Sequence, residues 1–102
     1  RKKDSIELVL NIMRWKKINH MPVINNKIKI IGLVSWTDVK YILNDKEKLK
    51  QSVGGFMKTE LITITQYETL VAANERMLNN NINCLPVVKK NKLIGILTSK
   101  DF

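Results

Sequence analysis

Gly-Leu-Val-Ser-Trp-Thr-Asp at residues 32–38 returns at residues 95–101 as Gly-Ile-Leu-Thr-Ser-Lys-Asp. Each copy is a glycine, two apolar residues, a hydroxyl residue, two spacers and an aspartate. Each follows an apolar run with a proline near its start, Pro22 in the first copy and Pro86 in the second. A segment that recurs together with its context indicates that one structural unit is used twice.

Aligning the two halves extends this repeat over most of the chain. At an offset of 64 residues the identical pairs are Met13/Met77, Ile18/Ile82, Asn19/Asn83, Pro22/Pro86 and Val23/Val87. At an offset of 63 they are Lys29/Lys92, Ile31/Ile94, Gly32/Gly95 and Asp38/Asp101. The offset changes within a predicted turn, where insertions are best tolerated. The alignment therefore predicts two copies of one fold.

Local patterns predict the elements of the first copy. A helix is expected over residues 5–17, capped by Asp4 or Ser5, because its apolar residues share one face. Residues 23–24 and 28–34 are expected to form a hairpin around an asparagine-rich turn. A second helix opens at residues 35–38, with Val39, Ile42 and Leu43 facing inward. The charged residues 45–50 suggest a solvated helix end or linker.

The second copy repeats this order after a break at Gly54-Gly55. Residues 61–65 are expected to form an opening strand. A helix should begin at Thr69 and stop at the asparagines 79–81. A hairpin of residues 85–88 and 93–97 should follow.

Composition narrows the function classes. Cys84 is the only cysteine, so no internal disulfide can form, which favours a cytoplasmic location. The apolar runs are too short for a membrane segment. The formal net charge of +9 fits either an anionic partner or a lysine-rich surface. No stripe of lysines alternates with aromatic residues, so no nucleic-acid partner is expected.

The sequence gives no pattern typical of catalysis. It shows no paired general acid and base, no nucleophile with an oriented base, and no phosphate-cradling glycine loop. His20 stands without a second histidine or a cysteine cluster, so no metal site is predicted. We therefore expect a protein that is not an enzyme.

The recurring aspartate has two open interpretations. A carboxylate accepts two donors, which suits the neighbouring hydroxyls of a ribose, and a helix start favours a phosphate. Alternatively, Ser35-x-x-Asp38 and Thr98-x-x-Asp101 fit a capping box that stabilises a helix start. The two roles can coexist.

The order strand, helix, Pro-Val strand, Gly-x-x-Ser/Thr-x-x-Asp and helix resembles a CBS domain, and two in tandem resemble a Bateman module. The resemblance implies an α+β fold of two β-α-β-β-α repeats, packed sheet to sheet about a pseudo-two-fold axis. Residues 1–52 would form the first repeat without its opening strand. Residues 53–102 would form the second without its final helix, so the chain is expected to be part of a larger parent protein.

The resemblance also implies a regulatory module that binds an adenosine ligand, such as AMP, ADP, ATP or S-adenosylmethionine, in clefts between the repeats. It would control an attached or partner protein and form a homodimer through the repeat helices, with Trp15 at the dimer surface. The alternative is a pair without ligand that serves as a dimerisation or packing module.

Each expected cleft combines residues of both repeats. Cleft A would use Leu33, Ser35, Thr37, Asp38, Met57, Leu61, Ile62, Ile82 and Asn83. Cleft B would use Ile96, Thr98, Lys100, Asp101, Ile18, Asn19 and His20. Cleft A is expected to bind better, because the strand that would complete cleft B is missing.

Overall fold

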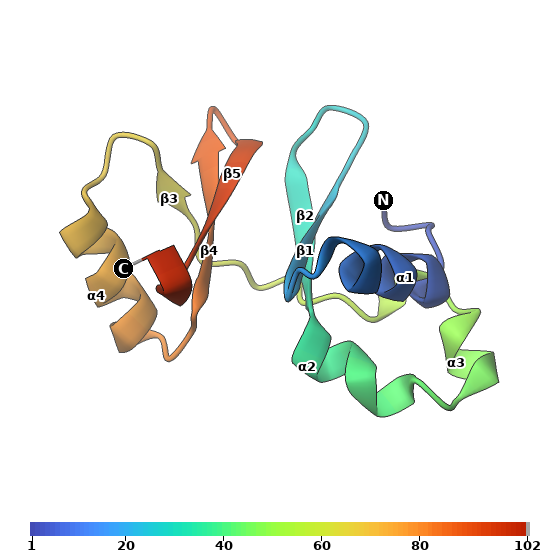
Figure 1. Ribbon diagram of the computed structural model, residues 1–102. Coiled ribbons are helices and arrows are strands. Elements are labelled where there is room, and N and C mark those ends of the chain that lie inside the picture. Colours follow the sequence, from blue (N-terminus) through green and yellow to red (C-terminus); the bar gives the residue numbers. More distant parts are fainter. Residues whose placement is uncertain (102) are drawn as a thin grey trace. The chain divides into compact units, whose positions relative to one another are not determined.

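The computed structural model describes residues 1–101, which form two compact units that divide between Leu61 and Ile62 (Figure 1). Phe102, the last residue of the predicted second repeat, lies outside the described residues. Both units combine helices with a small sheet, as the α+β prediction requires.

Unit 1 packs its helices on a two-stranded antiparallel sheet. Its elements are α1 (Ile6–Lys16), β1 (His20–Ile24), β2 (Ile30–Ser35), α2 (Trp36–Val39), η1 (Lys40–Ile42), α3 (Lys46–Leu49) and η2 (Val53–Gly55). Its buried core is formed by Ile6, Val9, Leu10, Met13, Val23, Val34, Val39, Ile42, Leu49 and Val53. The apolar face predicted for the first helix therefore lies entirely in this core.

Helix α1 begins and ends as its sequence predicts. The Ser5 Oγ atom accepts a hydrogen bond from the Leu8 amide at 3.1 Å, so Ser5 rather than Asp4 is the N-cap. Lys17 adopts a left-handed conformation (φ 55°), and its amide bonds the carbonyls of Arg14 and Met13.

The first hairpin differs from the prediction at both strand starts. β1 begins at His20, so Pro22 lies inside the strand, which a sheet edge tolerates because no partner needs its missing N–H. β2 begins at Ile30 rather than at Ile28. The Asn25 side chain accepts the amides of Lys27 and Lys29, which widens the turn and holds Ile28 at φ 63°.

Of the two alternatives for residues 45–50, a solvated helix end or a linker, the linker is wrong: the segment is helical and its charged residues are exposed. Asp45 caps a short helix, α3, by accepting the Lys48 amide at 3.1 Å. Leu49 is buried in the core of unit 1, and this burial holds the charged segment against the fold.

Unit 2 contains β3 (Ile64–Thr65), α4 (Leu70–Asn79), β4 (Cys84–Lys89), β5 (Lys92–Thr98) and η3 (Ser99–Asp101). The sheet order is β3-β4-β5, with β3 parallel and β5 antiparallel to β4. Thr69 caps α4 and Asn80 ends it, as predicted. Ile64, Ala73, Met77 and Leu85 form the buried core.

The predicted strand over residues 61–65 shrinks to two residues. The carbonyl of Thr63 accepts a hydrogen bond from the Arg76 guanidinium at 2.8 Å instead of a strand partner. The Glu68 carboxylate accepts a hydrogen bond from the same guanidinium at 2.6 Å and another from the Thr65 amide. These bonds, that of Arg76 first, lower the pKa of Glu68 to about 2.

The duplication is visible in matching irregularities. Each sheet shifts register at the same place, between Val23 and Ile24 and between Val87 and Val88. Two backbone hydrogen bonds also recur at equivalent positions: Ile18 N–Met13 O and Ile82 N–Met77 O, then Trp36 N–Asn19 O and Ser99 N–Asn83 O. The recurrence of these register shifts and hydrogen bonds at equivalent positions is expected when one fold is used twice.

Candidate functional site

The first copy of the recurring motif lies where β2 passes into α2. The Ser35 hydroxyl donates to the Asp38 carboxylate at 2.8 Å and lies 3.1 Å from the Thr37 hydroxyl. The Asp38 side chain remains 42% exposed. A carboxylate that is oriented by a hydroxyl yet open to solvent can still accept donors from a ligand.

The second copy is bonded differently. The Asp101 carboxylate accepts the backbone amide of Thr98 at 2.7 Å, which is one half of a capping box. In the first copy Ser35 makes no side-chain cap bond, and its hydroxyl points to Asp38. The capping interpretation therefore fits Asp101, whose Oδ2 atom also lies 3.4 Å from the Thr98 hydroxyl, whereas the Asp38 carboxylate bonds the Ser35 hydroxyl. Asp101 is exposed and Asp38 is partly exposed.

A lysine that the sequence did not single out lies beside Asp38. The Nζ atom of Lys58 is 4.0 Å from the Oδ2 atom of Asp38. Lys58 is held there by two backbone hydrogen bonds to Leu33, at 3.0 and 2.9 Å. An ammonium group at this place gives the site a positive charge next to its carboxylate.

Gly32 makes room for this arrangement. A Cβ atom at Gly32 would lie 2.1 Å from the Met57 sulfur, so the Met57 side chain occupies its present place only because position 32 has no side chain. At Gly95, the equivalent position, nothing lies within 4 Å of such an atom. A glycine inside a strand often marks a place where another segment approaches closely. Gly32 was therefore the sequence signal that could have pointed to the segment carrying Lys58.

The helix start that the sequence expects to favour a phosphate belongs to a short helix. α2 has four residues and passes directly into the 3₁₀ turn η1. So short a helix has too few aligned peptides for a strong macrodipole. The phosphate role of this helix start stays a prediction, and Lys58 adds a positive charge near Asp38.

The remaining residues assigned to cleft A fall in both units. Leu33 and Met57 lie beside the motif in unit 1, and Leu61 ends that unit. Ile62 and Ile82 pack on the core of unit 2, and Asn83 accepts the Ser99 amide through its carbonyl. The assignment of all of them to one cleft stays a prediction.

The residues assigned to cleft B are likewise divided. Ile96 and Thr98 lie on β5, and Lys100 and Asp101 follow in η3. Ile18 and Asn19 precede β1, and the partly buried His20 begins that strand. Their common role stays a prediction.

Other candidate chemistry finds little support. Cys84 is buried, and burial raises the pKa of its thiol to about 11, so it stays protonated at neutral pH. Residues 1–101 contain no group of three or more His, Cys, Asp or Glu that could hold a metal ion. In the same residues, no helix has the length and apolar character needed to span a membrane.

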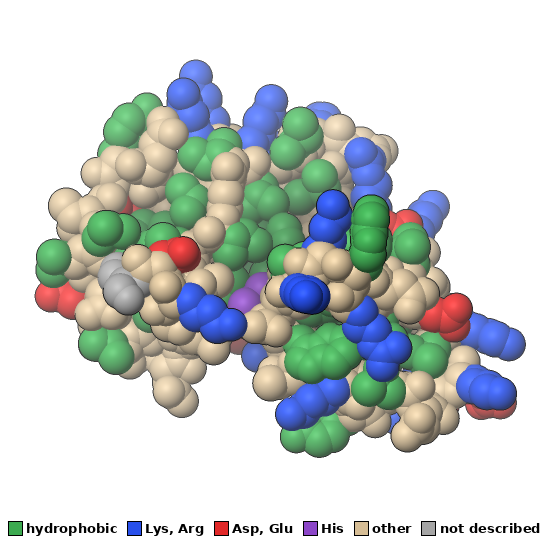
Figure 2. Space-filling model, in the orientation of Figure 1, with side chains coloured by type: hydrophobic (Ala, Val, Ile, Leu, Met, Phe, Trp, Pro, Cys, Tyr) green, Lys and Arg blue, Asp and Glu red, His purple; other side chains and the backbone are tan. Residues whose placement is uncertain are grey.

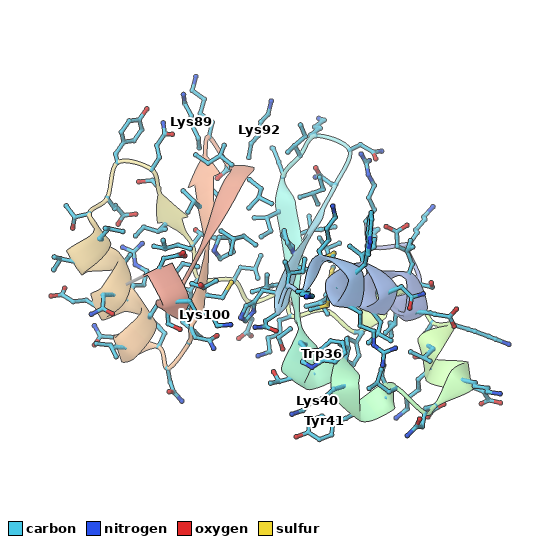
Figure 3. All side chains as sticks on the ribbon, in the orientation of Figure 1. Trp36, Lys40, Tyr41, Lys89, Lys92 and Lys100 are labelled. Atoms are coloured by element: carbon cyan, nitrogen blue, oxygen red, sulfur yellow. The ribbon has the colours of Figure 1, made fainter. Side chains whose placement is uncertain are left out.

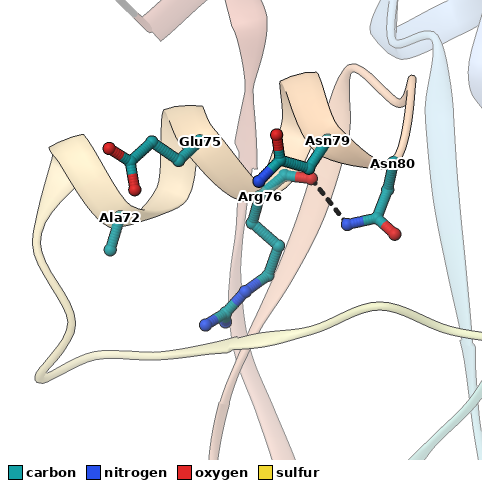
Figure 4. A pocket seen from close by; sticks show the side chains of 5 residues that line it. All are labelled: Ala72, Glu75, Arg76, Asn79 and Asn80. Atoms are coloured by element: carbon teal, nitrogen blue, oxygen red, sulfur yellow. Dashed lines mark hydrogen bonds between the residues drawn. The ribbon is translucent and has the colours of Figure 1, made fainter.

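A shallow pocket lies on α4, lined by Ala72, Glu75, Arg76, Asn79 and Asn80 (Figure 4). The Arg76 guanidinium is already bonded to Glu68 and Thr63, and the Asn80 side chain donates to the Arg76 carbonyl at 2.8 Å. Because the Arg76 and Asn80 side chains of this pocket already bond groups of unit 2, we assign the pocket no ligand.

The CBS domain model matches residues 1–45 and 53–102. The chain belongs to the CBS domain family. Solved CBS pairs have the same fold: the pair of protein MJ0100, in complex with 5′-methylthioadenosine and S-adenosyl-L-methionine, superimposes with a TM-score of 0.87 at 26% identity, covering 99% of this chain and 80% of that one. The CBSX2 structure in complex with AMP gives 0.86 at 29% identity, covering 98% and 79%.

Relatives by sequence are longer proteins. Homoserine O-acetyltransferase of Methanococcoides burtonii is 35% identical over 99 residues, covering 95% of this chain and 20% of that protein. Inosine-5′-monophosphate dehydrogenase of Methanocaldococcus jannaschii is 30% identical over 99 residues, covering 96% and 19%. The chain thus spans about a fifth of the length of these relatives.

Proposed function

We propose that this CBS pair is a regulatory module that senses an adenosine ligand such as AMP, ADP, ATP or S-adenosylmethionine. The first motif copy would be the principal binding element, with Asp38 accepting the two ribose hydroxyls. The chain itself carries out no chemical step in this proposal. It would control a larger parent or partner protein.

The observation that carries the proposal is the geometry around Asp38. Its side chain is 42% exposed, and its carboxylate accepts a hydrogen bond from the Ser35 hydroxyl, which can rotate toward a ligand. Charge-assisted bonds to a ribose are favourable for such an acceptor. CBS pairs of 26% and 29% identity hold adenosine compounds, which supports the same ligand class here.

Lys58 suggests how ligands would be distinguished. An ammonium group 4.0 Å from Asp38 lies within reach of a phosphate attached to a ribose held by that carboxylate. We therefore expect Lys58 to favour AMP, ADP and ATP over 5′-methylthioadenosine. S-Adenosylmethionine carries a positive charge at the same end and should gain nothing from Lys58.

Regulation would operate by linkage. A ligand shifts the equilibrium between two states of the module only by its difference in affinity for them. The same binding raises stability by about 2.7 kcal/mol when the ligand is at one hundred times its dissociation constant. A melting experiment is therefore a direct readout of binding.

The test is a thermal-shift and calorimetry series with AMP, ADP, ATP, S-adenosylmethionine and NAD. Asp38→Ala should abolish the ligand-dependent shift, whereas Asp101→Ala should reduce it less. Glu47→Ala, which removes an exposed carboxylate from α3, is the matched control. Binding that survives Asp38→Ala and is lost in Asp101→Ala would refute the assignment.

The second candidate is a CBS pair without ligand that acts as a dimerisation module. It is favoured by exposed apolar side chains on both long helices: Leu8 and Trp15 on α1, and Leu70, Val71 and Leu78 on α4. Sedimentation equilibrium of the chain and of Leu78→Lys would test it. A dimer weakened by this change, with no shift for any ligand, would favour this candidate.

A further inference from the structure

The first residues of unit 1 are attached to the turn η2 by backbone hydrogen bonds. The Gly54 amide donates to the carbonyl of Lys2 at 2.7 Å, and the Val53 amide donates to that of Asp4 at 2.6 Å. We name residues 1–5 the N-terminal strap. In Figure 1 it runs from the end marked N to the start of α1. Its main chain is therefore held by η2, at two successive amides.

The strap crosses η2 where only a glycine fits. A Cβ atom at Gly54 would lie 2.7 Å from the carbonyl oxygen of Lys2 and 2.9 Å from its Cβ atom. Because the carbonyl belongs to the backbone, a side chain at position 54 must push the main chain of the strap away. At Gly55 nothing lies within 4 Å of such an atom. Neither glycine has a positive φ, so alanine at either position meets no conformational strain of its own.

The same turn is bonded to the segment that carries Lys58. The carbonyl of Val53 accepts the amides of Phe56 at 3.0 Å and Met57 at 2.9 Å. Val53 is completely buried in the core of unit 1, which fixes the place of η2. Its amide thus holds the strap, and its carbonyl holds the residue before Lys58, whose Nζ atom lies 4.0 Å from Oδ2 of Asp38.

We propose that the N-terminal strap transmits ligand binding at Asp38, an inference that rests on the proposed adenosine function. A phosphate bonded to Lys58 restricts the motion of residues 56–58. The turn η2 and the strap are restricted with them, because hydrogen bonds join all three. The ligand therefore tightens the strap. Coupling between two sites is reciprocal, so a docked strap raises the affinity for the ligand by the same factor.

The strap presents this change at the surface. Its residues Arg1, Lys2 and Lys3 are exposed, although the carbonyl of Lys2 is bonded to η2. Figure 2 shows basic side chains projecting from this part of the molecule. A parent or partner protein that holds these charged side chains, or pulls them away, would change the affinity at Asp38 without touching the ligand.

The experiment follows amide hydrogen exchange by NMR, with and without AMP. The Gly54 amide reports docking of the strap, because its acceptor is the Lys2 carbonyl. Saturating AMP should slow its exchange about 5- to 150-fold, the usual range of a coupling between two sites. The Glu68 amide, which bonds the Thr65 carbonyl in unit 2, is the control and should change little.

Two lysine variants test the route. In Lys58→Ala, saturating AMP should no longer slow exchange at Gly54, because the phosphate contact is gone. Lys40→Ala removes an exposed lysine from η1 (Figure 3) and should keep the effect.

Two pairs of glycine variants test the coupling from the other side. Gly54→Ala should weaken AMP binding about 5- to 150-fold in calorimetry, and Gly55→Ala should leave it unchanged. Gly32→Ala displaces the Met57 side chain and should speed exchange at Gly54 in the absence of any ligand. Gly95→Ala, with open space around it, should not.

The outcomes for the strap and for the proposed function are distinguishable. If AMP gives neither a thermal shift nor a calorimetric signal, the adenosine function fails, and the strap proposal fails with it. If AMP binds but exchange at Gly54 is unchanged, or if Gly54→Ala binds AMP as tightly as Gly55→Ala, only the strap proposal is overturned. If Gly54→Ala does not fold, exchange in the unaltered chain still decides the outcome.

Discussion

Replacing Gly32 by alanine tests how the candidate site is built. The added Cβ atom would lie 2.1 Å from the sulfur and 2.6 Å from the Cγ atom of Met57. Contacts under 3 Å force movement, and here the Met57 side chain must give way. Gly95→Ala is an internal control, because the equivalent position has open space around it.

Two opposing effects on the free energy of unfolding decide the outcome of each glycine substitution. Overpacking a well-filled site costs about 1 to 3 kcal/mol. Replacing a strand glycine by alanine without strain stabilises by about 0.4 to 1 kcal/mol, through the unfolded state. Gly32→Ala should therefore lose about 1 to 2 kcal/mol, which corresponds to a fall in Tm of about 4 to 16 °C for a chain of this size. Gly95→Ala should be neutral or slightly stabilising.

The assay is urea and thermal denaturation followed by circular dichroism, with ligand calorimetry on the same variants. Because Met57 and Lys58 are adjacent, displacing Met57 should also weaken nucleotide binding. Adding Met57→Ala to Gly32→Ala should remove most of the penalty, giving a coupling energy of about 0.5 to 3 kcal/mol. Equal stability of Gly32→Ala and Gly95→Ala would show that Met57 does not occupy this space.

Two further predictions concern titrating groups, and the Lys58 proposal supplies a third. The folded pKa of Glu68 is about 2, below its ordinary 4.5, so its stabilising contribution is complete above pH 4.5 and disappears as the pH falls toward 2. Glu68→Gln should flatten the stability profile in that window, and an unchanged acid transition would contradict the Arg76 pairing. The Cys84 thiol, with its pKa raised to about 11, should react with a disulfide reagent at pH 8 only after unfolding in guanidinium, so rapid labelling of the folded chain would disprove its burial. Lys58→Ala should weaken AMP binding more than 5′-methylthioadenosine binding in calorimetry, and equal losses would exclude a phosphate contact.

Local patterns predicted much of each unit correctly. Ser5, Thr69 and the apolar face of α1 mark helices because capping and 3.6-residue periodicity act over only a few positions. Strand boundaries were less accurate. Residues 61–63 have strand composition, yet Arg76 takes the carbonyl of Thr63, and no local pattern reveals that competition.

The candidate site shows the same division. The repeated aspartates are evident from the sequence, but the contrast between Asp38 and Asp101 is not, because both motifs have the same spacing. It became visible only when Asp38 was found to bond the Ser35 hydroxyl at 2.8 Å, whereas Asp101 bonds the Thr98 amide at 2.7 Å and the Thr98 hydroxyl at 3.4 Å.

By itself, therefore, the sequence determined the duplication, the family and the identity of the acidic groups, since these depend on residue type and spacing along the chain. The tertiary structure alone decided that Lys58 lies beside Asp38 and that Arg14 covers Trp36. Both contacts join residues about twenty positions apart. Their formation depends on how strands and helices pack after they form, and packing is a property of the whole unit rather than of any short segment.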